Sequence, residues 1–395
     1  MNALISHRDA ASLASAVYEI QSDTFTPATI DRFKSQWDLS SESSVVNGKS
    51  GTLWVIKKQT GFGVVAEGRG DFEGDILILL RGTDNNFDWA TDATVGFSPS
   101  ATGRFVHTGF NACFHSVLPE LAQQLTGIKQ RFSGQGKTIG TVHCVGHSLG
   151  GALATLTAEW LNKSQHVHHT NVKLYTFGSP RVGGHSFVKL VTDEMDEGKD
   201  IYRVYHKTDV VPMVPLWPFY HLPEKRQGYC LKSPGSMPSG EFHKMKNYIA
   251  SVSKTASWET MYELEPDVTQ GAIEQWLSSD GPLSLTMNTM NMINKAIAYV
   301  LQKVLKVAGI SLQLGIASGV TLLDMLAYIL MRGIDFSKTL SSWVYRLVKR
   351  IMVALGMKIK KDIDLTMSFI RHIFKQLKDK VDRLVQVAVH SIFDH

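Results

Sequence analysis

Two hydrophobic patterns divide the chain. In the first 280 residues, short apolar and β-branched runs bounded by glycine or polar residues alternate with segments whose apolar residues recur at helical spacing. Short apolar strands between helices are typical of a sheet covered on both faces. We therefore predict an α/β fold with helices on both faces of the sheet. The expected strands include 53–56, 62–66, 75–80, 142–145, 173–177 and 201–205, and the expected helices include 111–125 and 151–161.

The second pattern is helical throughout. Polar and turn residues at 278–282 interrupt two helical patterns, which indicates a boundary near residue 280. We predict an α/β domain over residues 1–280 and an all-helical domain over residues 281–395. In the second part, apolar residues recur at spacings of three and four with basic residues between them, over 290–305, 343–355 and 370–384.

Charge and cysteine content sharpen this division. The net charge of +5 combines +9 from residue 281 onward (16 basic, 7 acidic) with −4 from the first 280 residues (25 basic, 29 acidic). A basic, apolar tail on a mildly acidic front indicates two parts with different partners, and we expect no nucleic acid among them. The three cysteines, Cys113, Cys144 and Cys230, are widely spaced and form neither a disulfide framework nor a zinc signature.

The tail also suggests contact with a membrane. Residues 307–323 carry no charge, which is close to the lower limit of about 17 apolar residues for a membrane-spanning helix. Gly315 and Gly319 within this run form a G-x-x-x-G pair. The segment 343–351 reads as a basic amphipathic helix of the kind that settles on anionic lipid. A soluble helical bundle with the apolar run at its centre is the alternative, and the two can coexist if the tail opens on lipid.

The first residues of the chain predict where the protein is located after synthesis. They lack a basic start followed by an apolar run, so we expect no secretory signal peptide and a cytoplasmic protein as synthesised. Action elsewhere then needs a leaderless route of delivery.

The most specific chemical signal is a nucleophile elbow. The apolar run 142–145 leads into Gly146-His147-Ser148-Leu149-Gly150, and the small residues that follow begin a helix. G-x-S-x-G between a strand and a helix exposes the serine on a strained turn, and glycine lets the neighbouring chain pass closely. The backbone N–H of Leu149, at the helix start, points at the oxyanion that forms during attack on a carbonyl. The sequence therefore predicts Ser148 as the nucleophile of an α/β-hydrolase.

Several further motifs, in the same order, resemble the class 3 (fungal-type) lipases of the α/β-hydrolase superfamily over roughly residues 53–251. They are Arg81-Gly82-Thr83 with 88–92, 106–110, 177–183 and Thr208-Asp209-Val210-Val211-Pro212. The resemblance implies that the backbone N–H groups of Thr83 and Leu149 form the oxyanion hole. It also implies a lid at 84–97, in which Phe87 and Trp89 meet lipid on opening, with ordinary packing as the alternative for both residues.

The triad acid and base follow from chain order and the resemblance. The triad of α/β-hydrolases runs Ser, then Asp or Glu, then His. Asp209 follows an apolar run and precedes a proline-rich loop, and Asp193 and Asp200 are the alternatives.

His243 resembles the final histidine of the family, although Phe242 stands where the family usually has aspartate. The alternative base, His221, matches a non-triad histidine of the family. The predicted triad is Ser148, Asp209 and His243, which needs no metal or cofactor.

Two hypotheses about function follow. In the first, the chain hydrolyses carboxylic esters of lipids as a phospholipase A or lipase, and its basic tail carries it to membranes. A leaderless lipase of this kind can be a delivered toxin or effector, in which case we expect a neutralising partner protein. In the second, the helical tail inserts into membranes and the hydrolase domain is a scaffold. The complete Ser, Asp and His set favours the first hypothesis.

Overall fold

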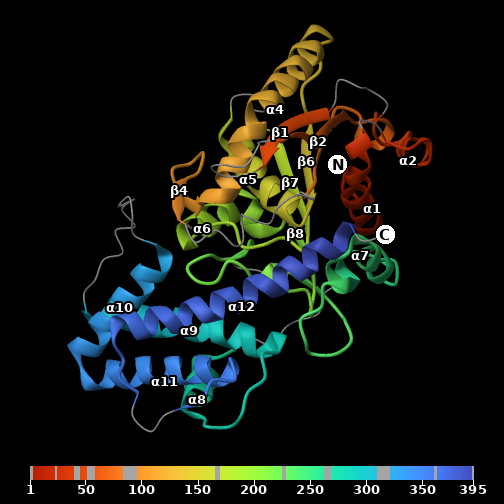
Figure 1. Cartoon of the computed structure of the whole chain (residues 1–395). Helices are drawn as coiled ribbons and strands as arrows, with labels where there is room; N and C mark the ends of the chain where they lie inside the picture. The colour runs from red at the N-terminus through yellow and green to blue at the C-terminus, as the bar shows by residue number, and fades with distance from the viewer. Residues whose placement is uncertain are drawn as a thin grey trace.

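A central sheet and a bundle of long helices make up the molecule (Figure 1). The structure is a computed structural model, and it describes residues 3–22, 25–39, 45–50, 58–82, 96–164, 170–224, 228–261, 268–308, 321–359 and 363–393.

The sheet has seven strands in the order β1-β2-β3-β6-β7-β8-β9. β1, β2 and β3 pair antiparallel, and the pairs from β3 through β6, β7 and β8 to β9 are parallel. The carboxyl ends of the parallel strands therefore meet at one edge, where α/β proteins place their ligands. The strands are β1 (Val45–Ser50), β2 (Lys58–Glu67), β3 (Ile76–Leu80), β6 (Thr141–His147), β7 (Asn171–Phe177), β8 (Ile201–His206) and β9 (Tyr229–Leu231), and a separate hairpin pairs β4 (Phe97–Pro99) with β5 (Phe105–His107).

Both faces of the sheet are buried. In β3 every residue is buried, with Ile76, Ile78 and Leu80 in one apolar cluster and Leu77 and Leu79 in another. Alternate side chains of a strand point to opposite faces, so a continuous apolar run fills two cores at once.

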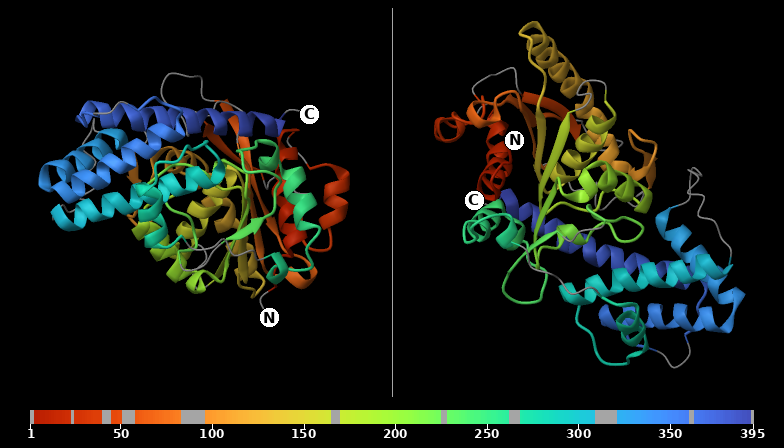
Figure 2. Two further views of the ribbon diagram at one scale, coloured as in Figure 1. Left: turned by 90° about the horizontal axis from the view of Figure 1, so that it is seen from below. Right: turned by 180° about the vertical axis from the view of Figure 1, so that it is seen from behind.

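Helices cover the two faces (Figure 2). One face is covered by α4 (Thr108–Gly134), α5 (Leu149–Lys163) and α6 (His185–Glu194), and the other by α1 (His7–Ala16), α2 (Pro27–Phe33) and α7 (Met245–Val252). Short helical turns follow at η1 (Val17–Ser22), η6 (Val211–Met213), η7 (Glu241–His243) and η8 (Glu259–Met261).

The C-terminal part is a bundle that we call the helical unit. Its helices are α8 (Gln270–Ser278), α9 (Met287–Ala308), α10 (Leu322–Phe336), α11 (Lys338–Ala354) and α12 (Met367–Phe393). α12 shows why these helices associate: Ile373, Leu377 and Val381 are buried, whereas Lys375 and Lys380 are exposed. An apolar stripe at spacings of three and four needs a partner, and the stripes of the neighbouring helices supply it.

α12 joins the two parts of the molecule. It starts in the helical unit and runs beneath the sheet until its end lies near α1 and α7 (Figure 1). On the way it contacts η7. The core of the helical unit also includes Val210, Val211, Val214 and Trp217 of the loop that follows β8. The two parts of the chain therefore share one apolar core at the carboxyl end of the sheet.

The fold class predicted from the sequence is confirmed: an α/β-hydrolase sheet is followed by helices. The expected strand at 53–56 and residues 309–320 of the uncharged run lie outside the described residues. In the described part of the chain, no helix combines the length and apolarity needed to cross a membrane. The boundary near residue 280 stays a prediction; α8, which precedes it, contributes Ile273 and Leu277 to the core of the helical unit.

Candidate active site

The nucleophile elbow forms between β6 and α5. Ser148 has φ 57° and ψ −130°, a backbone conformation that is strained for a residue with a side chain. A Cβ at Gly146 would lie 2.1 Å from the carbonyl oxygen of Gly150, and one at Gly150 would lie 2.1 Å from that of Leu80. The two glycines therefore let the strand, the helix and the neighbouring strand approach closely around the serine.

Three side chains from different elements meet at this turn. The imidazole Nε2 of His243, in η7, lies 3.0 Å from Ser148 Oγ, and its Nδ1 lies 2.7 Å from Asp209 Oδ2. Nδ1–H donates to the carboxylate, which leaves Nε2 to accept the serine proton. Ser148 is 1% exposed and His243 0% exposed. The structure thus brings together all three residues predicted as a triad, in hydrogen-bond order.

The carboxylate of Asp209 has two further donors. Its Oδ1 accepts from the backbone N–H of Val211 at 2.9 Å, and its Oδ2 accepts from the hydroxyl of Tyr248 at 2.7 Å. Burial raises the pKa of Tyr248 well above its ordinary value, so this phenol stays protonated and donates. Both donors hold the carboxylate in place, and the carboxylate in turn stabilises the imidazolium that forms on His243.

A second hydrogen-bond chain holds the base from behind. His147 Nε2 lies 2.8 Å from the carbonyl oxygen of His243, and its Nδ1 lies 2.7 Å from the hydroxyl of Tyr18. That hydroxyl also accepts from the backbone N–H of Gly82 at 3.3 Å. Burial lowers the pKa of His147 well below its ordinary value, so the ring is neutral: Nε2–H donates and Nδ1 accepts. This hydrogen-bond chain therefore links the residues after β3, η1, the elbow and η7.

The alternatives weighed from the sequence lie elsewhere. Asp193 pairs with Lys189 at 2.6 Å on α6, and Asp200 pairs with Lys173. His221 is about 2.6 Å from the carbonyl oxygen of Pro212, to which its Nε2 donates. Burial lowers its pKa well below the ordinary value, and it holds the loop that follows Asp209.

The predicted oxyanion hole is described in part. Leu149 begins α5, whose first N–H groups have no partner within the helix and carry the positive end of its dipole. A Cβ at Gly82 would lie 3.4 Å from the Ser148 Cβ, so this stretch of backbone passes beside the nucleophile. Thr83, Phe87 and Trp89 lie outside the described residues.

The helical unit contacts the elements that carry His243 and Asp209. α12 contacts η7, which carries His243, and the shared core holds the Val210–Trp217 stretch directly after Asp209. In the part of the chain that the structure describes, no three His, Cys, Asp or Glu side chains gather as metal ligands.

Residues 77–219 match the model of the class 3 lipase family. That segment contains β3 from its second residue onward, the elbow and Asp209. This part of the chain belongs to the class 3 lipase family. The match ends before His243 and before the helical unit.

Curated relatives also match part of the chain. The chain is 32% identical over 180 residues to the secreted mono- and diacylglycerol lipase 1 of Fusarium solani, which covers 45% of this chain and 49% of the relative. It is 28% identical over 218 residues to phospholipase A1-IIbeta of Arabidopsis thaliana (48% and 52%), and 36% identical over 152 residues to a lipase of Rhizomucor miehei (37% and 39%). The chain thus spans about half or less of the length of these curated relatives.

Among solved structures, the triacylglyceride lipase of Rhizomucor miehei matches with a TM-score of 0.41 and 24% identity. The match covers 56% of this chain and 77% of that one.

Inference from the sequence missed two residues of the class 3 lipase site. Tyr248 lies five residues beyond His243, and its contact with Asp209 depends on how α7 packs. Tyr18 comes from η1, 130 positions before the nucleophile, and no motif announces it.

Proposed function

We propose that the chain is a serine hydrolase that cleaves carboxylic ester bonds of lipids, as a phospholipase A or a lipase. The observation that carries this proposal is the buried relay from Ser148 Oγ through His243 to Asp209, with 3.0 Å and 2.7 Å steps. The names of the relatives, which include mono- and diacylglycerol lipase and phospholipase A1, support a lipid ester as substrate.

The chemistry follows from the relay. Ser148 Oγ attacks the ester carbonyl while His243 Nε2 takes its proton, and the backbone N–H of Leu149 stabilises the oxyanion. The intermediate collapses, His243 returns the proton to the leaving alcohol, and the acyl group stays on Ser148. Water, activated by the same imidazole, then releases the fatty acid. Asp209 keeps the imidazole oriented throughout.

If the hydrolase domain were only a scaffold, its buried ionisable pair and its strained serine would have no function. Burying an ionisable pair and a strained serine costs stability, and a binding scaffold needs neither. The relay therefore favours catalysis over the membrane-inserting alternative.

The outer face of the helical unit supports attachment to anionic lipid. α12 turns its apolar stripe into the core and leaves Arg371, Lys375, Lys380 and Arg383 exposed. Basic side chains near an anionic lipid surface contribute about 1 kcal/mol each. In this proposal the membrane is a docking surface for the closed protein. The cytoplasmic location, the leaderless delivery, the toxin or effector role and the neutralising partner stay predictions from the sequence.

Fatty-acid release from phospholipid vesicles and from a triglyceride emulsion tests the proposal. We expect release by the wild type and loss on the order of a thousandfold or more in Ser148→Ala. Ser133→Ala, at an exposed position at the end of α4, is the matched control and keeps wild-type activity. Release from vesicles identifies a phospholipase and release from the emulsion alone a neutral lipase. Equal release by wild type and Ser148→Ala on both substrates contradicts the proposal.

A further inference from the structure

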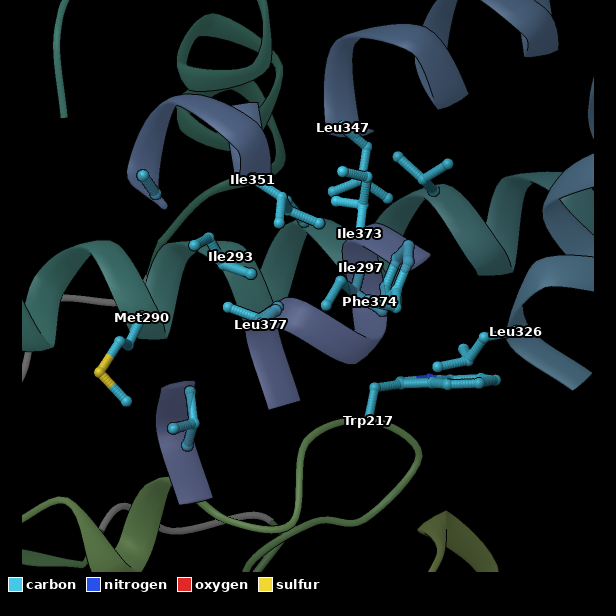
Figure 3. Packing of buried hydrophobic residues seen from close by; sticks show 14 of the residues in the cluster. Trp217, Met290, Ile293, Ile297, Leu326, Leu347, Ile351, Ile373, Phe374 and Leu377 are labelled. Carbon is cyan, nitrogen blue, oxygen red and sulfur yellow. The ribbon is translucent and has the colours of Figure 1, made fainter. Parts of the chain in front are cut away.

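An apolar cavity lies between the loop after Asp209 and the helical unit. Val214, Leu216 and Trp217 form its wall on the hydrolase side. Leu326 of α10 and Phe374 of α12 face them, and Figure 3 shows the Trp217 indole beside Leu326, with Phe374 nearby. The space is thus enclosed by two parts of the chain that are far apart in sequence.

The size of the cavity suits hydrocarbon. The volume open to the centre of a water molecule is about 60 Å³, within a partly open space of about 720 Å³ between atoms. On the smaller measure a water needs about 10–15 Å³, so the enclosed part has room for about five. A cavity lined by Leu, Val, Trp and Phe offers few hydrogen bonds to water, and cavities of this kind stay dry and bind apolar groups. An aliphatic chain makes more favourable contacts with the apolar walls of the cavity than water does.

One edge of the cavity is charged. Lys378 and Asp382, four residues apart on α12, also line it, and they form an ion pair of 2.5 Å. Their side chains are 20% and 12% exposed. Burial raises the pKa of Asp382 to about 6, although Lys378 opposes the shift. Burial therefore destabilises the ionised carboxylate of Asp382. The ammonium of Lys378 can bind another anion in place of this carboxylate.

We propose that this cavity binds a long-chain fatty acid anion, with the chain between Trp217 and Leu326 and the carboxylate on Lys378. An apolar wall with one ammonium at its edge matches the two ends of this ligand. The lining of the cavity includes none of the three relay residues, and binding there does not require the chain to hydrolyse lipids. It is connected to the relay through the loop from Asp209 to Trp217.

The neighbouring ion pair on the same helix offers a matched control. Lys375 and Asp379 have the same spacing as Lys378 and Asp382, lie 2.8 Å apart and are more exposed. The two pairs thus differ in exposure and in position, because neither Lys375 nor Asp379 lines the cavity.

Calorimetric titration of the full-length Ser148→Ala protein with oleate, below its micelle concentration, tests the proposal. We expect saturable binding with one oleate per chain. Lys378→Met should weaken it about tenfold to a hundredfold, as expected for loss of a hydrogen bond to a charged group, and Lys375→Met should leave it unchanged. Asp382→Asn should tighten it, because it removes the competing carboxylate. Leu323→Phe, at a half-buried position of the lining, should weaken it by filling the space.

Oleyl alcohol separates the contribution of the chain from that of the carboxylate. It should bind more weakly than oleate and be insensitive to Lys378→Met. Equal effects of Lys378→Met and Lys375→Met on oleate, or non-saturating uptake that Leu323→Phe leaves unchanged, would overturn the proposal. Each variant is compared at an unchanged circular dichroism spectrum and melting temperature. Because Ser148 is absent from every protein in this series, the result is independent of the proposed hydrolysis.

Discussion

The class 3 lipase domain differs from the helical unit because it buries a connected cluster of polar side chains beside its apolar cores. At the carboxyl end of its sheet, the lipase domain buries two histidines, an aspartate and a serine, each with a defined hydrogen-bond partner. The core of the helical unit is built from Ile, Leu, Val and Met at helical spacing. Polar burial demands specific geometry, whereas apolar burial demands volume and pattern. Substitutions should therefore mainly affect rate in the first region and mainly stability in the second.

The largest expected effect is on rate, at the acid of the relay. Asp209→Asn keeps the size of the side chain but removes the charge that selects the tautomer of His243, and we expect kcat to fall on the order of 10⁴-fold. The unfolding free energy should change far less in proportion. Hydrolysis of a short soluble ester, with urea unfolding alongside, measures both. If the fall in kcat of Asp209→Asn were explained by a smaller fraction of folded protein, the two regions would not differ in the way described.

The second effect is on stability, where the two regions meet. Trp217 is buried in the shared core, and its backbone N–H donates to Asn294 Oδ1 of α9 at 2.8 Å. Trp217→Ala should cost about 3–5 kcal/mol, as truncations of large buried aromatics do. Urea unfolding measures it, and Tyr328→Ala, at an exposed position of α10, is the control with little effect. If Trp217→Ala lowered the free energy of unfolding as little as Tyr328→Ala does, the shared core would not stabilise the protein.

A smaller effect concerns pH and Asp382. Its pKa is about 6 in the folded protein and near the ordinary 3.8 in the unfolded chain. The folded state therefore binds the proton more tightly, and this contribution is complete below about pH 4 and lost as the pH rises through 6. Relative to Asp382→Asn, wild-type stability should fall by on the order of 2–3 kcal/mol between pH 4 and pH 7. Asp379→Asn should not reproduce this difference in paired unfolding curves.

The smallest effect is at Tyr248, which acts on the relay through Asp209 as a positioning residue. Tyr248→Phe removes one donor to Asp209 Oδ2 and should lower kcat about tenfold with KM nearly unchanged. Initial rates on the soluble ester measure this, with Tyr229→Phe on β9 as the control. A change in KM alone would show that the phenol shapes substrate binding instead of orienting the acid.

The two regions also differ in how far the sequence predicts them. The elbow was predictable because G-x-S-x-G fixes a local turn, and Asp209 and His243 were predictable because the family motifs and chain order fix their places. The contacts of Tyr18 and His147 were not, because they join elements far apart in the chain.

In the helical unit the pattern predicted helices over 290–305, 343–355 and 370–384, and each falls within an observed helix or overlaps its end by one residue. Amphipathicity alone says which face is buried but not against what. The position of α12 across η7, and the inclusion of Trp217 in the bundle core, therefore emerged only from the structure. The basic amphipathic segment 343–351, which indicated lipid contact, lies in α11 and packs its apolar face inside the protein.

The most direct test of the central claim is covalent labelling with a fluorophosphonate in the presence of phospholipid vesicles, followed by peptide mass mapping. The account predicts one labelled residue, Ser148, and labelling slowed by at least a hundredfold in His243→Ala. Labelling of another serine, or equal rates in wild type and His243→Ala, would contradict a relay in which His243 activates Ser148.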